Sequence, residues 1–156
     1  MGYDAHRFAA PEAARALMLA GVRIPHEQGL AGHSDADVVL HAVVDALLGA
    51  AALGDIGAYF PSSDERWRGA SSATFVTAAL EALTRDGWRV VNVDTTIVTE
   101  RPRLSPHVPA MRAAVAELLG IALDRVSVKS KTTDGMGFTG RYEGIACYAI
   151  AMIERG

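Results

Sequence analysis

Apolar residues recur every three to four positions in three stretches of the chain, and this spacing predicts amphipathic helices. The three predicted helices follow Ser34 as far as about Leu48, run from Ser71 or Ser72 to just before Gly87, and run from Pro106 or Pro109 to just before Gly120. Ser34 is expected to cap the first helix, with Asp35 and Asp37 in its first turn, where carboxylates interact favourably with the helix dipole. This helix would therefore combine a polar start with an apolar, buried remainder.

Short runs rich in β-branched residues lie between the helices and predict strands. The predicted strands cover residues 1–8, 17–20, 22–24, 88–98, 125–130 and 142–153, and the segments 9–15, 25–32, 53–69, 99–106 and 131–140 are expected to be loops. This mixed order favours one sheet with helices packed on it. We therefore predict an α+β fold in a single domain, residues 1–156, with a mixed β-sheet covered on one face by helices. Apolar residues on the other face indicate oligomerisation.

Composition narrows the functional class only slightly. The chain has 156 residues, half of them apolar, which suits one domain with a real core. A net charge of -3 gives no basic patch for nucleic acid. No apolar run reaches the roughly 18 residues of a membrane span, and no signal-peptide pattern is expected at the start. The single Cys147 fits a reducing compartment, the cytoplasm or a plastid-like one.

Two histidines and an aspartate form a candidate metal site. Asp4 and His6 are two positions apart on the first predicted strand, so they project from the same face, and His41 offers a third ligand. Two imidazoles and one carboxylate suit zinc, and three ligands leave the fourth position open, as in catalytic sites. An Asp-X-His pair alone is more often an ordinary surface pair. Asp37 or Asp45 could accept the second N–H of His41, although a helix-start or solvated role fits them equally well.

Other polar segments suit a phosphorylated substrate. His33 and Ser34 lie where a helix is expected to begin, and the exposed N–H groups of helix starts bind phosphate. The segment Lys129–Asp134 follows a strand and offers cations and hydroxyls for a polyphosphate, with a carboxylate for Mg²⁺. This segment, like Thr99–Ser105 and Gly54–Gly57, could equally be a polar turn. The residues alone therefore predict metal-dependent phosphate chemistry without naming the substrate.

Seven motifs follow one another at compatible spacing: GYDAHRF, AGVRIP, GHSDADVVLHAVVDALLGAAALGDIG, FPSSD, RPRLSPH, KSKTTD and GFTGRYEGIACYA. Together they span nearly the whole chain, and they resemble the 2-C-methyl-D-erythritol 2,4-cyclodiphosphate synthases of the non-mevalonate isoprenoid pathway. The resemblance implies a lyase that cyclises 4-diphosphocytidyl-2-C-methyl-D-erythritol 2-phosphate. In this reaction the 2-phosphate attacks the β-phosphorus and CMP leaves, so the protein mainly positions the substrate and neutralises charge.

The resemblance also implies roles for single residues. Asp4, His6 and His41 would bind zinc, His33 and Thr132 would stabilise the transition state, and Mg²⁺ or Mn²⁺ would accompany the diphosphate. The residues that would contact substrate are Asp4, Ala5, His6, His33, Ser34, Asp55, Ile56, Gly57, Phe60, Pro61, Ser62, Ser63, Asp64, Thr99, Glu100, Arg101, Pro102, Arg103, Leu104, Ser105, Lys131, Thr132, Thr133, Asp134, Phe138 and Arg141.

A homotrimer is a further implication, with sheets packed around the trimer axis and active sites between subunits. Phe138 and Arg141 match positions near that axis, where an isoprenoid diphosphate is expected in a cavity. Asp134 stands where the family usually has Glu, so Mg²⁺ would be held there through a water or by a shifted loop. The family usually has more residues before Asp4, so we expect a short first strand or a start further upstream.

Two alternative functions remain open at the level of sequence. A zinc-dependent phosphoester hydrolase would also use an open metal site and phosphate-binding loops, although neither a second metal cluster nor a general base is evident. A non-enzymatic trimeric module that binds nucleotides or isoprenoids would bind ligand without turnover. Release of CMP without incorporation of water into the product distinguishes the cyclase from both.

Overall fold

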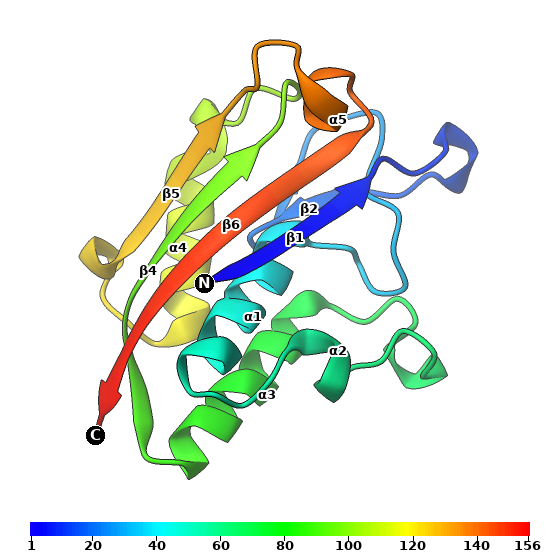
Figure 1. Ribbon diagram of the computed structural model, residues 1–156. Coiled ribbons are helices and arrows are strands. Elements are labelled where there is room, and N and C mark those ends of the chain that lie inside the picture. The colour runs from blue at the N-terminus through cyan, green and yellow to red at the C-terminus, as the bar shows by residue number, and fades with distance from the viewer.

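Residues 1–156 are described by a computed structural model, in which four strands form one sheet and two more form a separate hairpin. The strands are β1 (Gly2–Arg7), β2 (Leu17–Leu19), β3 (Val22–Ile24), β4 (Trp88–Val98), β5 (Val126–Lys131) and β6 (Gly144–Arg155). The order across the large sheet is β1-β6-β4-β5, so β1 and β5 form its two edges (Figure 1). β6 is antiparallel to both neighbours, whereas β4 and β5 are parallel.

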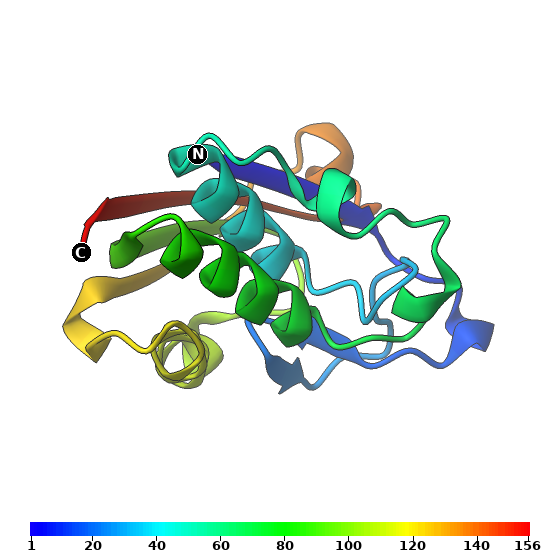
Figure 2. The ribbon, with the colours of Figure 1, turned by 90° about the horizontal axis from the view of Figure 1, so that it is seen from below.

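Helices cover one face of this sheet, as Figure 2 shows for α1, α3 and α4. The helices are α1 (Val38–Ala50), α2 (Ile56–Tyr59), α3 (Ser72–Arg85), α4 (Val108–Leu119) and α5 (Gly137–Gly140), and the 3-10 turns are η1 (Pro11–Ala13), η2 (Glu65–Trp67), η3 (Ser105–His107) and η4 (Leu123–Arg125). The predicted α+β fold with a one-sided cover is therefore confirmed. No helix combines the length and the hydropathy of a membrane span.

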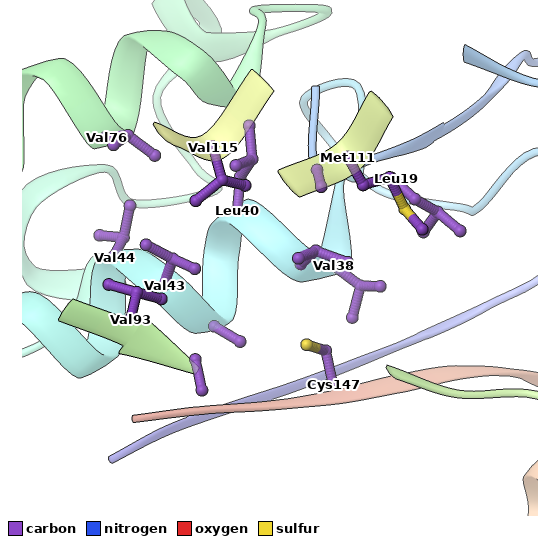
Figure 3. Packing of buried hydrophobic residues seen from close by; sticks show 14 of the residues in the cluster. Leu19, Val38, Leu40, Val43, Val44, Val76, Val93, Met111, Val115 and Cys147 are labelled. Atoms are coloured by element: carbon purple, nitrogen blue, oxygen red, sulfur yellow. The ribbon is translucent and has the colours of Figure 1, made fainter. Parts of the chain in front are cut away.

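The helix α1 occupies the centre of the core. Ten of its 13 residues are buried, because it packs against β1 and β6 on one side and α3 on another. Figure 3 shows its valines among side chains of other elements, with Cys147 projecting from β6 towards Val38. Burying one such side chain contributes about 1.5–3 kcal/mol, so this packing fixes α1 firmly against the sheet.

The strand β1 lies unusually close to α1 at one point. A Cβ atom added to Gly2 would come within 2.0 Å of the Ala42 carbonyl oxygen, so only glycine allows this approach. The backbone of β1 therefore rests almost directly on the backbone of α1. As a result, the side chains that follow Gly2 along β1 are held beside the first turns of the helix.

The first helix begins later than the sequence predicted. Asp37 caps α1 in place of Ser34, because its carboxylate accepts hydrogen bonds from the N–H groups of Val39 and Leu40. Ala36 has a left-handed backbone with φ of 59°, which interrupts the helical path. The Ser34 hydroxyl instead accepts the N–H of Ala36 at 3.1 Å. The prediction of Ser34 as N-cap, with Asp35 and Asp37 in the first turn, was therefore wrong.

The expected loop at residues 53–69 contains two short helical elements, α2 and η2. Each begins at an aspartate whose carboxylate accepts a backbone N–H: Asp55 from Ala58, and Asp64 from Arg66. A single helical turn is too short to produce an apolar repeat, so periodicity gave no sign of either element. This segment runs from the end of α1 to the start of α3 and lies over the beginning of α1.

The face of the sheet opposite the helices carries apolar side chains from β1 and β6. Tyr3, Tyr148, Ile150 and Met152 are between 44% and 58% exposed, and the rings of Tyr3 and Tyr148 lie 4.9 Å apart. A row of large apolar side chains on one sheet face is typical of a surface that another protein surface covers.

Candidate metal centre

Asp4, His6 and His41 meet at one point, as the sequence predicted. Asp4 and His6 alternate on β1 and face α1, and His41 lies in the first turn of that helix. Asp4 Oδ2 is 2.8 Å from His6 Nε2 and 3.0 Å from His41 Nδ1, and the two imidazole nitrogens are 3.2 Å apart. Three atoms with lone pairs thus converge within hydrogen-bonding distance, which is the arrangement of an open site for a divalent metal.

Partners outside the cluster orient both imidazoles. His6 Nδ1 lies 2.7 Å from the carbonyl oxygen of Ala31, and because a carbonyl only accepts, Nδ1 carries the proton. His6 Nε2 is then unprotonated in the neutral ring and presents its lone pair to the cluster. His41 Nε2 lies 2.9 Å from Ser72 Oγ and 3.2 Å from Ser34 Oγ. In each ring, therefore, one nitrogen is hydrogen-bonded to a partner outside the cluster and the other nitrogen points into the cluster.

The charges within the cluster reinforce one another. Burial disfavours ionisation of Asp4, but hydrogen bonds to His41 and His6 outweigh it and lower the pKa of Asp4. Burial likewise disfavours the charged form of His6, yet its interactions with Asp4 and the Ala31 carbonyl raise the pKa of His6. The ionised Asp4 carboxylate therefore favours a positive charge beside it, which a proton on an imidazole or a bound metal ion can supply.

The carboxylates expected to support His41 do not reach it. Asp37 is fully buried and accepts N–H groups from Ala20 and Gly21 as well as from its own helix. Asp45 accepts the N–H of Ile56 at 2.8 Å. Of the roles left open for these carboxylates, the helix-start role holds for Asp37. Neither carboxylate is hydrogen-bonded to His41, because nearby backbone donors occupy both. Sequence reasoning missed Ser72, which fills this role from α3.

The cluster opens onto a pocket of about 240 Å³. The residues that line it are Asp4, His6, His33, Ser34, His41, Ile56, Gly57, Phe60, Ser62, Trp67 and Phe75. One wall is aromatic: Phe60 stacks on Phe75 with ring centroids 4.5 Å apart, and Trp67 meets both edge-on. Neither Phe75, which lies in the second predicted helix, nor Trp67 was predicted to line a site. Their contact with the predicted FPSSD segment could not be inferred from spacing.

His33 lies in this pocket and is held from several sides. Its Nε2 is 3.0 Å from the carbonyl oxygen of Asp64, and its own carbonyl accepts the N–H of Gly69 at 2.8 Å. The Arg15 guanidinium donates to the carbonyls of Gly32 and Ser34, on either side of His33. The backbone that carries His33 is therefore fixed beside the metal cluster. Sequence reasoning did not identify Arg15.

The other predicted segments form a second pocket, of about 360 Å³, at the β5 edge of the sheet. It is lined by Thr99, Glu100, Pro102, Arg103, Leu104, Ser105, Ser130, Lys131 and Thr132. Glu100 joins its two loops, because its carboxylate accepts the N–H of Thr133 at 2.8 Å, and this hydrogen bond lowers the pKa of Glu100. Asp134 is exposed, and its carboxylate lies 3.4 Å from Thr132 Oγ1.

Ten predicted residues line neither of these two pockets: Ala5, Asp55, Pro61, Ser63, Asp64, Arg101, Thr133, Asp134, Phe138 and Arg141. Asp55 caps α2, and Asp64 forms an ion pair with Arg66 at 2.6 Å. Phe138 lies on α5, and Arg141 directly follows it and pairs with Glu143 at 2.7 Å. Within one chain, the structure thus groups the predicted residues into a metal pocket, a loop pocket and ten positions outside both.

An open two-imidazole, one-carboxylate centre, accompanied by a pocket rich in hydroxyls and cations, defines the class of metal-dependent enzymes that act on phosphorylated substrates. The model of the YgbB family matches residues 1–154, so the chain belongs to the YgbB family.

Curated relatives agree with this assignment. The chain is 53% identical to a 2-C-methyl-D-erythritol 2,4-cyclodiphosphate synthase of Syntrophomonas wolfei, covering 99% of this chain and 96% of that protein. It is 58% identical to the bifunctional enzyme IspD/IspF of Paramagnetospirillum magneticum, where 97% of this chain aligns but spans only 39% of the larger protein. The family resemblance found in the sequence is therefore confirmed.

Solved structures show the same fold. A 2C-methyl-D-erythritol-2,4-cyclodiphosphate synthase in a CDP-bound form has a TM-score of 0.88 and 33% identity, covering 98% of this chain and 97% of that one. The bifunctional IspDF of Campylobacter jejuni has a TM-score of 0.94 and 36% identity, covering 99% of this chain and 41% of that one. The predicted fold class is thus shared with proteins of known structure.

Proposed function

We propose that this chain is a lyase that converts 4-diphosphocytidyl-2-C-methyl-D-erythritol 2-phosphate to 2-C-methyl-D-erythritol 2,4-cyclodiphosphate and CMP, in isoprenoid precursor biosynthesis. The observation that carries the proposal is the open Asp4–His6–His41 centre, in a chain that aligns with such synthases along almost their full length. Residues 1–156 act as one synthase domain. The free Cys147 thiol supports a reducing, cytoplasmic location.

Zinc is the ion proposed for the three-ligand centre, since two imidazoles and one carboxylate match its preferences. When bound, it supplies Lewis acidity and neutralises phosphate charge. Mg²⁺ or Mn²⁺ would accompany the diphosphate near Asp134, whose exposed carboxylate is free to meet a hydrated ion. Elemental analysis tests both assignments: one zinc per chain after dialysis, and a lighter ion retained only with substrate, are the expected results.

The protein side chains position the substrate and do not act as nucleophiles. The nucleophile is the 2-phosphate of the substrate, whose oxygen forms a bond to the β-phosphorus as the bond to the CMP oxygen breaks. His33 is fixed in the metal pocket, where its imidazole can meet negative charge on the reacting phosphates. Thr132 offers a hydroxyl from the loop pocket, and Lys131 offers a cation. The segment 99–105 would hold the cytidine, and Asp55 and Gly57 would contact the methylerythritol.

We also infer that each active site combines two chains of a homotrimer. The metal pocket lies at the β1 edge and the loop pocket at the β5 edge, which are separated by three strand spacings of about 4.8 Å. A neighbouring chain that brings its loop pocket to the metal pocket would let one substrate meet both. The apolar sheet face around Tyr148 and Ile150 would be covered in such a trimer. Phe138 and Arg141 would face an axial cavity that accepts an isoprenoid diphosphate.

Isotope labelling tests the reaction. Incubation of the metal-loaded protein with the cytidine substrate in H₂¹⁸O should release CMP and yield a cyclic diphosphate that contains no ¹⁸O. A phosphoester hydrolase would place ¹⁸O in a product phosphate, and a binding module would release no CMP. Either outcome would refute the cyclase, and His41→Ala provides the inactive control.

Subunit mixing tests the shared site. The variants His41→Ala and Thr132→Ala damage the metal pocket and the loop pocket, respectively. In mixed trimers some sites would combine an intact metal pocket with an intact loop pocket, so partial CMP release should return after co-refolding. Light scattering must show that both variants form trimers and exchange subunits. Absence of recovery at every mixing ratio would exclude sites shared between chains.

A further inference from the structure

We propose that Ser72, held by Asp35, is a positioning residue that fixes the tautomer of His41 and thereby prepares its Nδ1 for the metal. The inference rests on the metal centre of the proposed function and adds two residues to it. Ser72 is fully buried in the first turn of α3, and Asp35 lies in the segment before α1. Neither residue lines the metal pocket, so both act only through His41.

The Asp35 carboxylate is the acceptor in each of its hydrogen bonds. Its carboxylate accepts the hydroxyl proton of Ser72, the N–H of Ser72 at 3.0 Å and the N–H of Asp37 at 3.1 Å. All three partners are donors, which is the set that an ionised carboxylate requires, because it has only acceptor sites. The single hydroxyl proton of Ser72 is therefore used for Asp35.

Ser72 must then accept from His41. With its proton directed at Asp35, Ser72 Oγ presents lone pairs to His41 Nε2 at 2.9 Å, so Nε2 carries the N–H. Asp4 Oδ2 competes for the proton, because it also only accepts and lies 3.0 Å from Nδ1. Ser72 and Asp35 oppose Asp4 and shift the single N–H of a neutral ring towards Nε2. Nδ1 is the nitrogen that faces Asp4 and His6. The relay from carboxylate to hydroxyl to imidazole thus selects the one tautomer that can bind a metal at this point.

Ser34 cannot replace this selection. Its hydroxyl lies 3.2 Å from His41 Nε2 and accepts the N–H of Ala36, but no carboxylate takes its proton. It can therefore donate to Nε2 as readily as accept from it. Without Ser72, His41 would retain a partner but lose the preference for one tautomer.

The relay is mounted on two paired backbone segments rather than on a free loop. The N–H of Asp35 donates to the carbonyl of Ala70 at 2.9 Å, and the N–H of Gly69 donates to the carbonyl of His33 at 2.8 Å. This pairing holds the start of α3 against the segment before α1. Ser72 consequently keeps its place relative to His41 although the two residues lie on different helices.

Metal titration and ring nitrogen shifts test the relay through Ser72→Ala. Removing an outer partner of a metal-bound histidine typically weakens metal binding about 10–100-fold. We expect this loss in a chelator competition titration with zinc. In the metal-free protein, at a pH where the ring carries one proton, ¹⁵N shifts of His41 should move from the Nε2–H form towards the Nδ1–H form that Asp4 favours. Ser72→Thr retains the hydroxyl and should restore affinity. Asp35→Asn leaves Ser72 in place and should also mix the tautomers, so the test does not depend on one variant folding.

The neighbouring Ser71 provides a matched control. Its hydroxyl accepts the N–H of Ala73 at 3.3 Å and caps α3, but it does not contact His41. Ser71→Ala should therefore lower the melting temperature slightly and leave zinc affinity unchanged. Zinc affinity within twofold of wild type and an unchanged tautomer in Ser72→Ala would overturn the relay, as would equal weakening in Ser71→Ala.

The relay and the cyclase reaction can fail separately. If wild-type protein binds zinc but releases no CMP, the reaction is refuted while the titration still decides the relay. If wild-type protein releases CMP and Ser72→Ala binds zinc as tightly as wild type, the relay alone is refuted. If wild-type protein binds no zinc at the three ligands, both the metal assignment and the relay are refuted.

Discussion

The metal pocket and the loop pocket lie at opposite edges of one sheet and are built in opposite ways. At the β1 edge, Asp4, His6 and His41 are partly or fully buried, and each imidazole has a partner outside the cluster. At the β5 edge, the loops are largely exposed and are joined to each other through Glu100. One chain therefore provides a preorganised cluster of metal-binding side chains but only an open loop pocket. Under the proposed function, catalysis and nucleotide recognition are divided between these two surfaces.

Removal of a metal ligand should have the largest effect, because it disables one of the two pockets and leaves the other intact. His41→Ala is expected to abolish zinc binding and lower CMP release at least about a thousandfold, since a lost Lewis acid removes several kcal/mol of transition-state stabilisation. The fold should survive, because alanine favours helices. Zinc content and CMP release measure the effect. The control His26→Ala removes a histidine outside both pockets, and stoichiometric zinc in His41→Ala would disprove the ligand assignment.

Loss of the hydrogen bond between the two loops should weaken substrate binding and leave zinc binding unchanged. Glu100→Ala removes the acceptor that joins the two loops and is expected to raise KM roughly tenfold, with zinc content unchanged. The exposed Glu117→Ala on α4 is the control for loss of one charge. A change in zinc content would show that the two pockets are not independent.

The hydrogen bond between Glu100 and the Thr133 N–H should weaken as the pH falls. Because the pKa of Glu100 is lowered in the folded chain from its ordinary value of 4.5, its stabilising effect is complete above that pH. It is lost as the pH falls through the lowered value. Hydrogen exchange of the Thr133 N–H should therefore accelerate, relative to other loop amides, only at acidic pH. The Glu100→Ala variant should show no such step.

A smaller effect is expected from Asp134. If its carboxylate holds Mg²⁺ near the diphosphate, Asp134→Asn should require several-fold more Mg²⁺ or Mn²⁺ for half-maximal CMP release and keep its zinc. Asp134→Glu should behave like wild type, because the longer side chain reaches the same ion. An unchanged Mg²⁺ titration in Asp134→Asn would remove this residue from the ion site.

The smallest effect is expected from a substitution outside both pockets. Ala52 follows α1 with a left-handed φ of 58°, and the N–H of Leu53 donates to the carbonyl of Leu48, a helix ending that favours glycine. Ala52→Gly should raise the free energy of unfolding by about 0.5–1 kcal/mol. Activity and zinc content should not change. A lower melting temperature would contradict this interpretation of the helix end.

Local patterns predicted most of the fold and the three residues of the candidate metal cluster. β4 begins and ends at the predicted Trp88 and Val98, because a long β-branched run has no competing interpretation. Asp4 and His6 were paired by strand alternation alone. The meeting with His41 followed from residue chemistry, whereas the contact that realises it, β1 against α1, depends on three-dimensional packing.

The support of the metal centre could not be predicted in the same way. Helical spacing placed Asp37 and Asp45 beside His41, but spacing does not show that backbone N–H groups already occupy those carboxylates. Ser72 lies 31 residues from His41 in the chain, and no local pattern links them. Contacts between distant segments that depend on one proton or one hydroxyl are invisible to periodicity, however clear the elements themselves are.

The close approach at Gly2 has a consequence for protein design. Since a methyl group there would collide with the Ala42 carbonyl, the separation between strand and helix is set by bare backbone rather than by side-chain packing. Grafting only the three ligands onto another scaffold would leave that separation unspecified. The smallest transferable unit is therefore the strand with its glycine, together with the helix it touches. A scaffold that accepts this unit must offer a strand–helix pair with no side chain between them.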